Sequence, residues 1–352
     1  MHSVETTIFG ETPTGEVANL FTLRNTNGLI VKVTNYGAAI IQVHVPDRDG
    51  KLDDITLGFD DLPGYLNNDP FFGVVAGRYA NRIAKGQFKL NGKDYRLAIN
   101  NGPNHLHGGT TGFNKRFWSA VALNEEGKEG VRLTYESPDR EEGYPGKVTT
   151  QIDYTLNESN ELRIEYQAVS DTPTPINLTN HAYWNLGGEG SGHIGDHELT
   201  LNADLYTPVD ETLIPTGEIR CVNETPLDFR NPTKIGDRIA NVGHEPNGYD
   251  HNFVLNKSEI GAIELAATVR HEASGRRMEV WTSEPGIQLY TANFLDGSHR
   301  GKSGTPYEQQ HGFCLECQHF PDSPNHPHFP STTLRPETVY RQTTIHRFSN
   351  DG

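Results

Sequence analysis

The sequence predicts an all-β protein, built as a large antiparallel β-sandwich. Short apolar runs with a two-residue period recur along the chain, turn-forming residues bound them, and a sustained helical period is nearly absent. The 36 glycines and 21 prolines provide many turns, and a hydrophobic content of 34% is enough for a sizeable core. No Pro- or Ser-rich linker, charge block or repeat marks a boundary, so we expect a single domain over residues 1–352.

The clearest strands form a predicted β-hairpin over residues 151–156 and 161–169, joined by turn-forming residues. In its second arm, polar and apolar side chains alternate from residue 161 to residue 168, the period that a half-buried strand requires. Runs of the same kind predict further strands, and one weak helical pattern predicts a helix. The strands are expected at residues 29–33, 40–45, 87–90, 131–135, 199–201 and 287–290, and the short helix at residues 235–242.

The charge balance disfavours two classes of partner. Lys and Arg number 30 against 46 for Asp and Glu, which gives a net charge of −16. A net negative charge of this size repels nucleic acid and anionic membranes. No signal-peptide pattern opens the sequence, and no apolar run approaches the roughly 18 residues of a membrane span. The three cysteines are an odd number and do not close a disulfide framework, so we expect a reducing, cytoplasmic location.

Glu316 is a charged residue inside an apolar run, where an unpaired carboxylate is costly to bury. In a strand it shares a face with Cys314 and Gln318, while Leu315 and Cys317 point to the other face. A carboxylate at such a site, with its pKa raised by desolvation, is a candidate general base.

A zinc site is the competing interpretation of this region. Residues of metal-ligand type gather within it, namely His311, Cys314, Cys317, His319, His326 and His328. A strand sends Cys314 and Cys317 to opposite faces and no second cysteine pair follows, so the pattern gives zinc little support. The chain also lacks a Gly-rich phosphate loop and a Gly-x-Ser-x-Gly motif. We therefore expect no metal and no cofactor.

Polar residues also gather in other loops, at residues 77–86, 104–109, 177–188 and 248–255. Taken alone, Arg82 is typical of a solvated ion pair, and Asp250 is typical of a turn. His105 and His107 are equally compatible with ordinary loop positions. Each segment by itself is a weak signal of function.

In order along the chain, eight stretches together resemble the aldose 1-epimerase (galactose mutarotase) family. They are NYGAAI (35–40), LGFDDLPGYL (57–66), GRYANRIAKGQF (77–88), LHGG (106–109), NLTNHAYWNLGG (177–188), YDHNF (249–253), PGIQLYTANFLDG (285–297) and FCLECQHFPDSPNHPHFP (313–330). The resemblance covers almost the whole chain. It implies a single β-sandwich of the supersandwich type and an isomerase that interconverts the α and β anomers of free hexoses such as galactose and glucose.

The resemblance also implies the site residues. Glu316 matches the general base of the family, and His181 matches its general acid. Sugar-contacting positions are matched by Asn81, Arg82, His107, Asp250 and Gln288, with Asn81 the weaker candidate. Opening a sugar ring needs a base for the anomeric hydroxyl and an acid for the ring oxygen, which are the two tasks given to Glu316 and His181.

Three other functions stay open from the sequence. A hexose-6-phosphate epimerase would need several cations, and Arg78 and Lys85 lie near Arg82 along the chain. A non-catalytic sugar-binding protein would need neither Glu316 nor His181. A zinc enzyme would use the histidine-rich C-terminal region. The preferred aldose and the oligomeric state are open as well.

Overall fold

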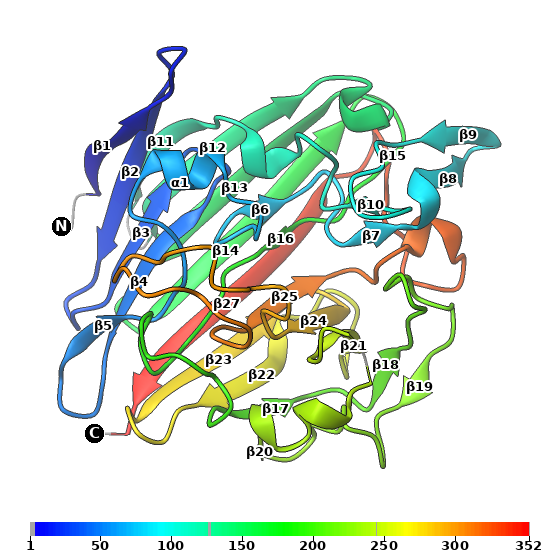
Figure 1. Cartoon of the computed structure of the whole chain (residues 1–352). Helices are drawn as coiled ribbons and strands as arrows, with labels where there is room; N and C mark the ends of the chain where they lie inside the picture. The colour runs from blue at the N-terminus through cyan, green and yellow to red at the C-terminus, as the bar shows by residue number, and fades with distance from the viewer. Residues whose placement is uncertain (1–3, 126–127, 244, 352) are drawn as a thin grey trace.

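The computed structural model describes residues 4–125, 128–243 and 245–351, and β-strands dominate it (Figure 1). Within these ranges the longest strands form one nine-stranded sheet, the large sheet, with the order β11-β12-β13-β14-β27-β23-β22-β17-β20. Its strands are β11 (Ser119–Glu125), β12 (Lys128–Ser137), β13 (Val148–Leu156), β14 (Glu161–Ser170), β27 (Tyr340–Asn350), β23 (Arg276–Thr282), β22 (Glu264–Arg270), β17 (Glu198–Leu201) and β20 (Thr233–Lys234).

Two five-stranded sheets complete the main layers of the described chain. The N-terminal sheet runs in sequence order, through β1 (Glu5–Glu11), β2 (Val17–Arg24), β3 (Ile30–Thr34), β4 (Ile40–Pro46) and β5 (Leu52–Asp54). The central sheet has the order β19-β18-β21-β24-β25, from β19 (Arg220–Cys221), β18 (Leu205–Thr207), β21 (Asp250–Val254), β24 (Gly286–Tyr290) and β25 (Cys314–Gln318).

Four short two-stranded ladders connect the loops around these sheets. They pair β7 (Arg82–Ile83) with β10 (His105–Leu106), β6 (Val75–Ala76) with β16 (Thr179–Asn180), β8 (Gln87–Leu90) with β9 (Lys93–Arg96), and β15 (Thr174–Pro175) with β26 (Thr333–Leu334). The ladder of β6 and β16 joins segments that are far apart in the sequence, and β16 lies next to β25 of the central sheet (Figure 1).

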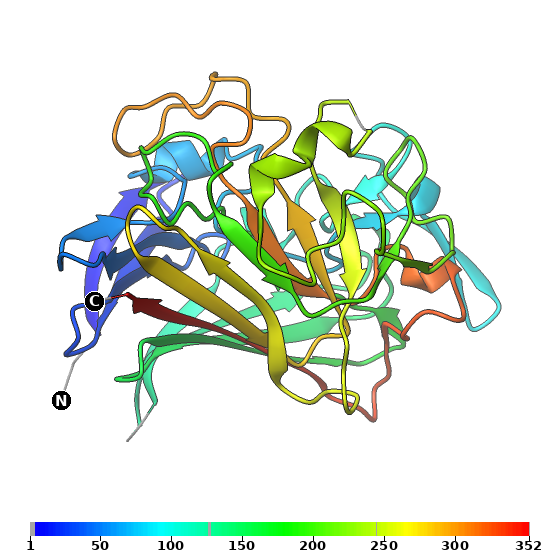
Figure 2. The same cartoon turned by 90° about the horizontal axis from the view of Figure 1, so that it is seen from below.

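The β-sandwich predicted from the sequence is confirmed. Side chains from the large sheet, such as Ile152 and Val280, pack in one buried cluster with Val31 of the N-terminal sheet and with Ile287 and Leu315 of the central sheet. Figure 2 shows the central sheet lying against the large sheet as a second layer. Burial of this shared apolar surface is the main stabilising term of the sandwich.

The predicted hairpin is strands β13 and β14, which pair antiparallel with Leu156 opposite Leu162. The apolar residues of β14 are buried and the alternate ones are partly exposed, as the two-residue period predicted. Asn160 has a φ of 59° in the turn, a left-handed conformation that Asn tolerates. The other predicted strands fall within or next to β3, β4, β8, β12, β17 and β24.

The predicted helix over residues 235–242 is wrong. The segment forms two 3₁₀ turns, η4 (Ile235–Asp237) and η5 (Ile239–Asn241), because Arg238 between them has φ −127° and ψ 2°. The one α-helix of the described chain is α1 (Leu62–Leu66), where the Asp61 side chain accepts the N–H of Gly64.

The remaining short helices are single 3₁₀ turns. They are η1 (Ala84–Gly86), η2 (Phe113–Lys115), η3 (Glu141–Gly143) and η6 (Ser323–Asn325). No helix within the described ranges has the length and apolar character of a transmembrane segment.

Candidate active site

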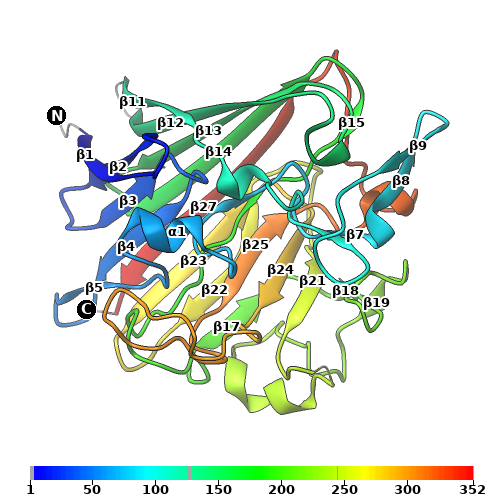
Figure 3. The same ribbon diagram turned by 45° about the horizontal axis from the view of Figure 1, so that its top comes forward.

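Six of the seven predicted site residues line one cavity of about 530 Å³. They are Asn81, Arg82, His107, His181, Asp250 and Glu316. The central sheet supplies Glu316 and Asp250 from β25 and β21, with β24 between them (Figure 3). Two of the short ladders supply the rest. Arg82 lies in β7 and His107 follows β10, which pair with each other, and His181 follows β16, which pairs with β6.

Glu316 lies in the middle of β25 and is 2% exposed. Burial raises the pKa of its carboxyl well above the ordinary range, and nearby Asp250 raises it further, while Arg82 acts in the opposite direction. Within the described chain its Oε2 atom has no hydrogen-bond partner. A buried carboxylate oxygen at a cavity wall with no protein partner is suited to accept a hydrogen bond from a ligand.

His181 lies next to Glu316 in the lining of the cavity, with 3.7 Å between its Nε2 and Oε1 of the carboxylate. Burial lowers the pKa of this histidine to about 4, so the ring is neutral near pH 7. The ring packs against Tyr183 and His107, with ring centroids 5.2 Å and 5.1 Å away. The two residues are 135 positions apart in the sequence, and the fold brings them together.

His107 is held in one tautomer by the backbone of Asn81, whose N–H donates to Nδ1 over 3.1 Å. The pKa of His107 is lowered well below its usual value by burial, then by His181 and Arg82, so the ring is neutral. Because Nδ1 accepts the hydrogen bond from Asn81, the single proton of the neutral ring is on Nε2. Asn81 and His107 have left-handed φ angles of 60° and 49°, and their backbones bond to each other through His107 N–H and Asn81 O.

Asp250 lines the cavity from within β21. One of its oxygens lies 3.8 Å from Nη1 of Arg82, and the other accepts a 2.6 Å hydrogen bond from the amide of Gln288. Arg82 is itself anchored by a bond from Nε to Asn101. Gln288, the seventh predicted site residue, is not among the lining residues: it is buried in β24, opposite Asn252 and Glu316 on the two neighbouring strands.

One group in the described chain has possible metal-ligand atoms close enough together to hold an ion. It consists of His107, His181 and Glu316, whose ligand atoms all lie within 4.8 Å of one another. The tautomer of His107 does not suit this role, because a neutral ring with Nδ1 occupied by the Asn81 N–H has no free lone pair. The arrangement therefore suits hydrogen-bond donation to an oxygen atom better than metal ligation.

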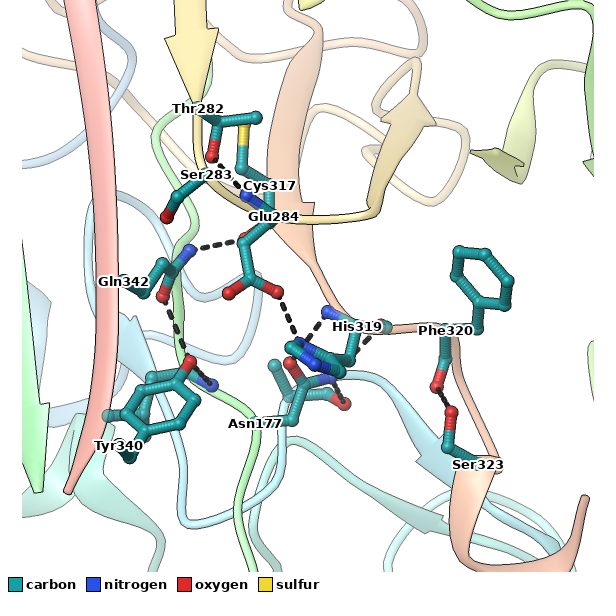
Figure 4. Close-up of polar contacts among 12 residues, drawn as sticks. Asn177, Thr282, Ser283, Glu284, Cys317, His319, Phe320, Ser323, Tyr340 and Gln342 are labelled. Atoms are coloured by element: carbon teal, nitrogen blue, oxygen red, sulfur yellow. Dashed lines mark hydrogen bonds and ion pairs between the residues drawn. The ribbon is translucent and has the colours of Figure 1, made fainter. Parts of the chain in front are cut away.

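The proposed C-terminal zinc ligands do not form such a group among the described residues. Cys314 and Cys317 pack into separate apolar clusters on opposite faces of β25. His319, the next histidine, pairs through Nδ1 with the buried Glu284 over 2.5 Å (Figure 4).

The cations near Arg82 in sequence are not cavity residues. Arg78 is buried and donates to the carbonyls of Pro145 and Gly146, so it fixes a loop. Lys85 is not among the lining residues either, whereas Lys115, which the sequence did not single out, is one of them. This distribution gives the phosphate-binding alternative little support. His105, left without a role, is a structural residue whose ring bonds to Ala98 O and to the hydroxyl of Tyr144.

Aromatic residues of the cavity were missed by the sequence analysis. They are Phe71, Tyr183, Tyr290 and Phe294. Tyr183 falls in the NHAYWN stretch and Tyr290 in GIQLY, so their position beside site residues was a usable signal. Phe71 had no such signal, because it follows a loop of Asn, Asp and Pro. It reaches the site only through tertiary packing against His107, with 4.8 Å between the two ring centroids.

Known proteins resemble this chain over nearly its full length. A sequence model of the aldose 1-epimerase family matches residues 19–347. The galactose mutarotase of Bos taurus is 48% identical over 350 residues, covering 99% of each chain, and that of Homo sapiens is 47% identical over the same span. An aldose 1-epimerase from Escherichia coli is 36% identical over 340 residues, covering 96% of each chain.

Solved structures give the same picture. A GalM/aldose epimerase homologue from C. elegans superposes with a TM-score of 0.87 at 34% identity, covering 95% of this chain and all of that one. A galactose 1-epimerase from Lactobacillus acidophilus superposes with a TM-score of 0.86 at 31% identity, covering 99% of this chain and all of that one.

Proposed function

Since the chain belongs to the aldose 1-epimerase family, we propose that it interconverts the α and β anomers of free hexoses through an acid–base reaction of Glu316 and His181. The resemblance seen in eight sequence stretches is confirmed by the family match. The observation that carries the proposed mechanism is the approach of His181 Nε2 to Glu316 Oε1, 3.7 Å apart at the wall of one cavity. A binding protein would need no such pair.

Glu316 is the proposed general base. It takes the proton from the anomeric hydroxyl while the bond between the anomeric carbon and the ring oxygen breaks. Its raised pKa brings the carboxylate closer to the basicity that proton abstraction near neutral pH requires. The unpartnered Oε2 supports this role, because the hydroxyl of a bound sugar would supply the missing hydrogen bond.

His181 is the proposed general acid, which gives a proton to the ring oxygen as it leaves the anomeric carbon. A neutral imidazole with a lowered pKa is an effective donor to an oxygen that gains negative charge. His107 presents a second Nε2–H, and Arg82 adds positive charge to the lining of the same cavity. Rotation about the bond between the first two sugar carbons exposes the other aldehyde face. Ring closure then returns the protons to give the opposite anomer.

Asp250 is the proposed anchor for the remaining hydroxyls, and Gln288 is proposed to act on the sugar through Asp250. The carboxylate is held from both sides, by Arg82 and by Gln288, so it presents a fixed acceptor. Asn81 is proposed to act through its backbone N–H, which fixes the tautomer of His107.

We also propose that the chain is one domain that works in a reducing, cytoplasmic compartment. The main buried cluster contains residues from Phe21 to Phe348, which supports the single domain. The thiols of Cys221, Cys314 and Cys317 are free, which supports the compartment.

Polarimetry on freshly dissolved α-D-galactose and α-D-glucose tests the proposed function. The chain should speed the approach to the equilibrium rotation above the spontaneous rate, and Glu316→Gln should remove this acceleration. Glucose 6-phosphate serves as the comparison substrate. Faster turnover of the phosphosugar than of glucose would contradict the free-hexose proposal, and sugar binding without acceleration would contradict catalysis.

A further inference from the structure

The thiol of Cys314 lies directly behind His181, with 3.6 Å between Sγ and Nδ1 of the ring. Cys314 opens β25, two residues before Glu316, and its side chain points to the same face of the strand. It is 0% exposed and belongs to one apolar cluster with Tyr183 and Tyr290, which line the cavity. The sulfur therefore contacts the ring at Nδ1, whereas Nε2 faces Glu316.

A neutral imidazole carries one N–H and one lone pair, so the partner of Nδ1 decides which nitrogen donates. Glu316 does not decide which nitrogen carries the proton. An ionised carboxyl group near Nε2 accepts a hydrogen bond, and a protonated one donates a hydrogen bond, so it is compatible with either form of the ring. His107 shows the same principle in this site, since the Asn81 N–H occupies Nδ1 and leaves the proton on Nε2. At His181, the group next to Nδ1 is the thiol of Cys314, whereas at His107 it is the backbone N–H of Asn81.

We propose that Cys314 is a positioning residue whose S–H donates to Nδ1 of His181 and keeps the ring proton on Nε2, the nitrogen that faces Glu316 and the cavity. The inference rests on the proposed role of His181 as general acid. Burial, together with the nearby carboxyl groups of Glu316 and Asp250, raises the pKa of the thiol well above its usual value, so the sulfur keeps its proton. The thiol makes no contact with the sugar in this scheme and acts only through the ring.

The same strand offers a matched control. Cys317 is an equally buried thiol three residues further on, but it packs in the main core and lies next to Thr282 (Figure 4). Cys317→Ala therefore removes one buried sulfur from β25 without touching His181. Cys314→Ala removes the proposed donor, and Cys314→Ser replaces it with a hydroxyl donor at the same position.

Two readouts test the proposal. The first is the ¹⁵N NMR spectrum of histidine-labelled protein, with the His181 signals assigned by their loss in His181→Asn. The wild type should show Nε2 protonated and Nδ1 as acceptor, Cys314→Ser should keep this form, and Cys314→Ala should give a mixture of tautomers. A wild-type ring protonated on Nδ1, or an unchanged tautomer in Cys314→Ala, overturns the proposal.

The second readout is the kinetics of anomer exchange. Cys314→Ala should lower kcat about tenfold, the effect of one weak hydrogen bond, with KM within roughly twofold. Cys314→Ser should recover most of kcat, and Cys317→Ala should leave it unchanged. An equal loss of kcat in Cys314→Ala and Cys317→Ala overturns the proposal in favour of general packing. If the wild type does not accelerate anomer exchange, the proposed function fails, while the NMR comparison still decides the tautomer.

Discussion

Gln288 donates a 2.6 Å hydrogen bond from its side-chain amide to Oδ1 of Asp250, on the neighbouring strand of the central sheet. The other carboxylate oxygen of Asp250 faces Arg82 at 3.8 Å. Gln288 is in turn held by Gln318, whose amide donates to its oxygen over 3.4 Å. A chain of buried amides on β24 and β25 thus fixes the orientation of a carboxylate at the cavity wall.

Asp250→Asn should weaken sugar binding more than it slows the reaction. The change keeps the size of the side chain but removes its charge, and a hydrogen bond to a charged group contributes about 1.5–3 kcal/mol. We expect KM for galactose to rise about tenfold or more, with kcat within roughly threefold of the wild type. Initial rates by polarimetry over a range of galactose concentrations give both constants. An unchanged KM would remove Asp250 from sugar binding.

Gln288→Ala should raise KM in the wild-type chain and have little further effect in the Asp250→Asn background. The reason is that Gln288 is outside the lining of the cavity and donates a hydrogen bond to Asp250, so we expect its influence to pass through that carboxylate. Residues that act as one unit have non-additive effects, which a double-mutant cycle measures. Equal losses in both backgrounds would instead mean that Gln288 contacts the sugar directly.

Glu316→Gln should lower kcat by about 10²–10⁴-fold, the usual contribution of a positioned base. The substitution keeps the shape of the side chain and removes a buried group whose charged form is costly. We therefore expect the thermal unfolding midpoint to stay at or above that of the wild type. If activity were lost and this midpoint also fell, the variant would have a folding defect, and the loss would not identify Glu316 as the base.

The acid side of the pH–rate profile should fall at a pH well above 4.5. Burial and Asp250 raise the pKa of Glu316, and the base is lost as the pH falls through that raised value. Asp250→Asn removes the charge that, after burial, raises this pKa, so the acid limb of kcat/KM should move to lower pH. A limb that stays in place would mean that another group controls it.

The fold was predictable where the signal was local. The alternation in β14 places Leu162 and Ile164 in the core without knowledge of their partners, and Glu316 stands out because a charge interrupts an apolar run. The bond from Asn81 N–H to His107 Nδ1 was not predictable. It joins two loops in left-handed conformations, and only the packed fold brings them together. Gln288 was given a sugar contact because its position matches the family, whereas its hydrogen bond to Asp250 depends on the pairing of β21 with β24.

His346 should make the protein less stable as the pH falls from about 6.5 towards 4. Burial lowers the pKa of this histidine to about 4, whereas in the unfolded chain it is near 6.5, so in this window the unfolded state binds a proton that the folded state does not. The folded state therefore loses up to about 3 kcal/mol per such group as the pH falls. His105 and His197 add to the same trend, because burial lowers their pKa to about 4 and about 3.

His346→Phe should reduce this acid sensitivity, because it removes the titrating group and keeps an aromatic ring against Trp184, 4.9 Å away between centroids. The measurement is the midpoint of urea unfolding at pH 7.5, 6 and 4.5. The midpoint should fall less between pH 7.5 and 4.5 in His346→Phe than in the wild type. His328→Gln, a change at an exposed histidine, is the matched control and should follow the wild type. If His346→Phe and His328→Gln lost the same amount of stability on acidification, the buried ring would not be a source of the acid sensitivity.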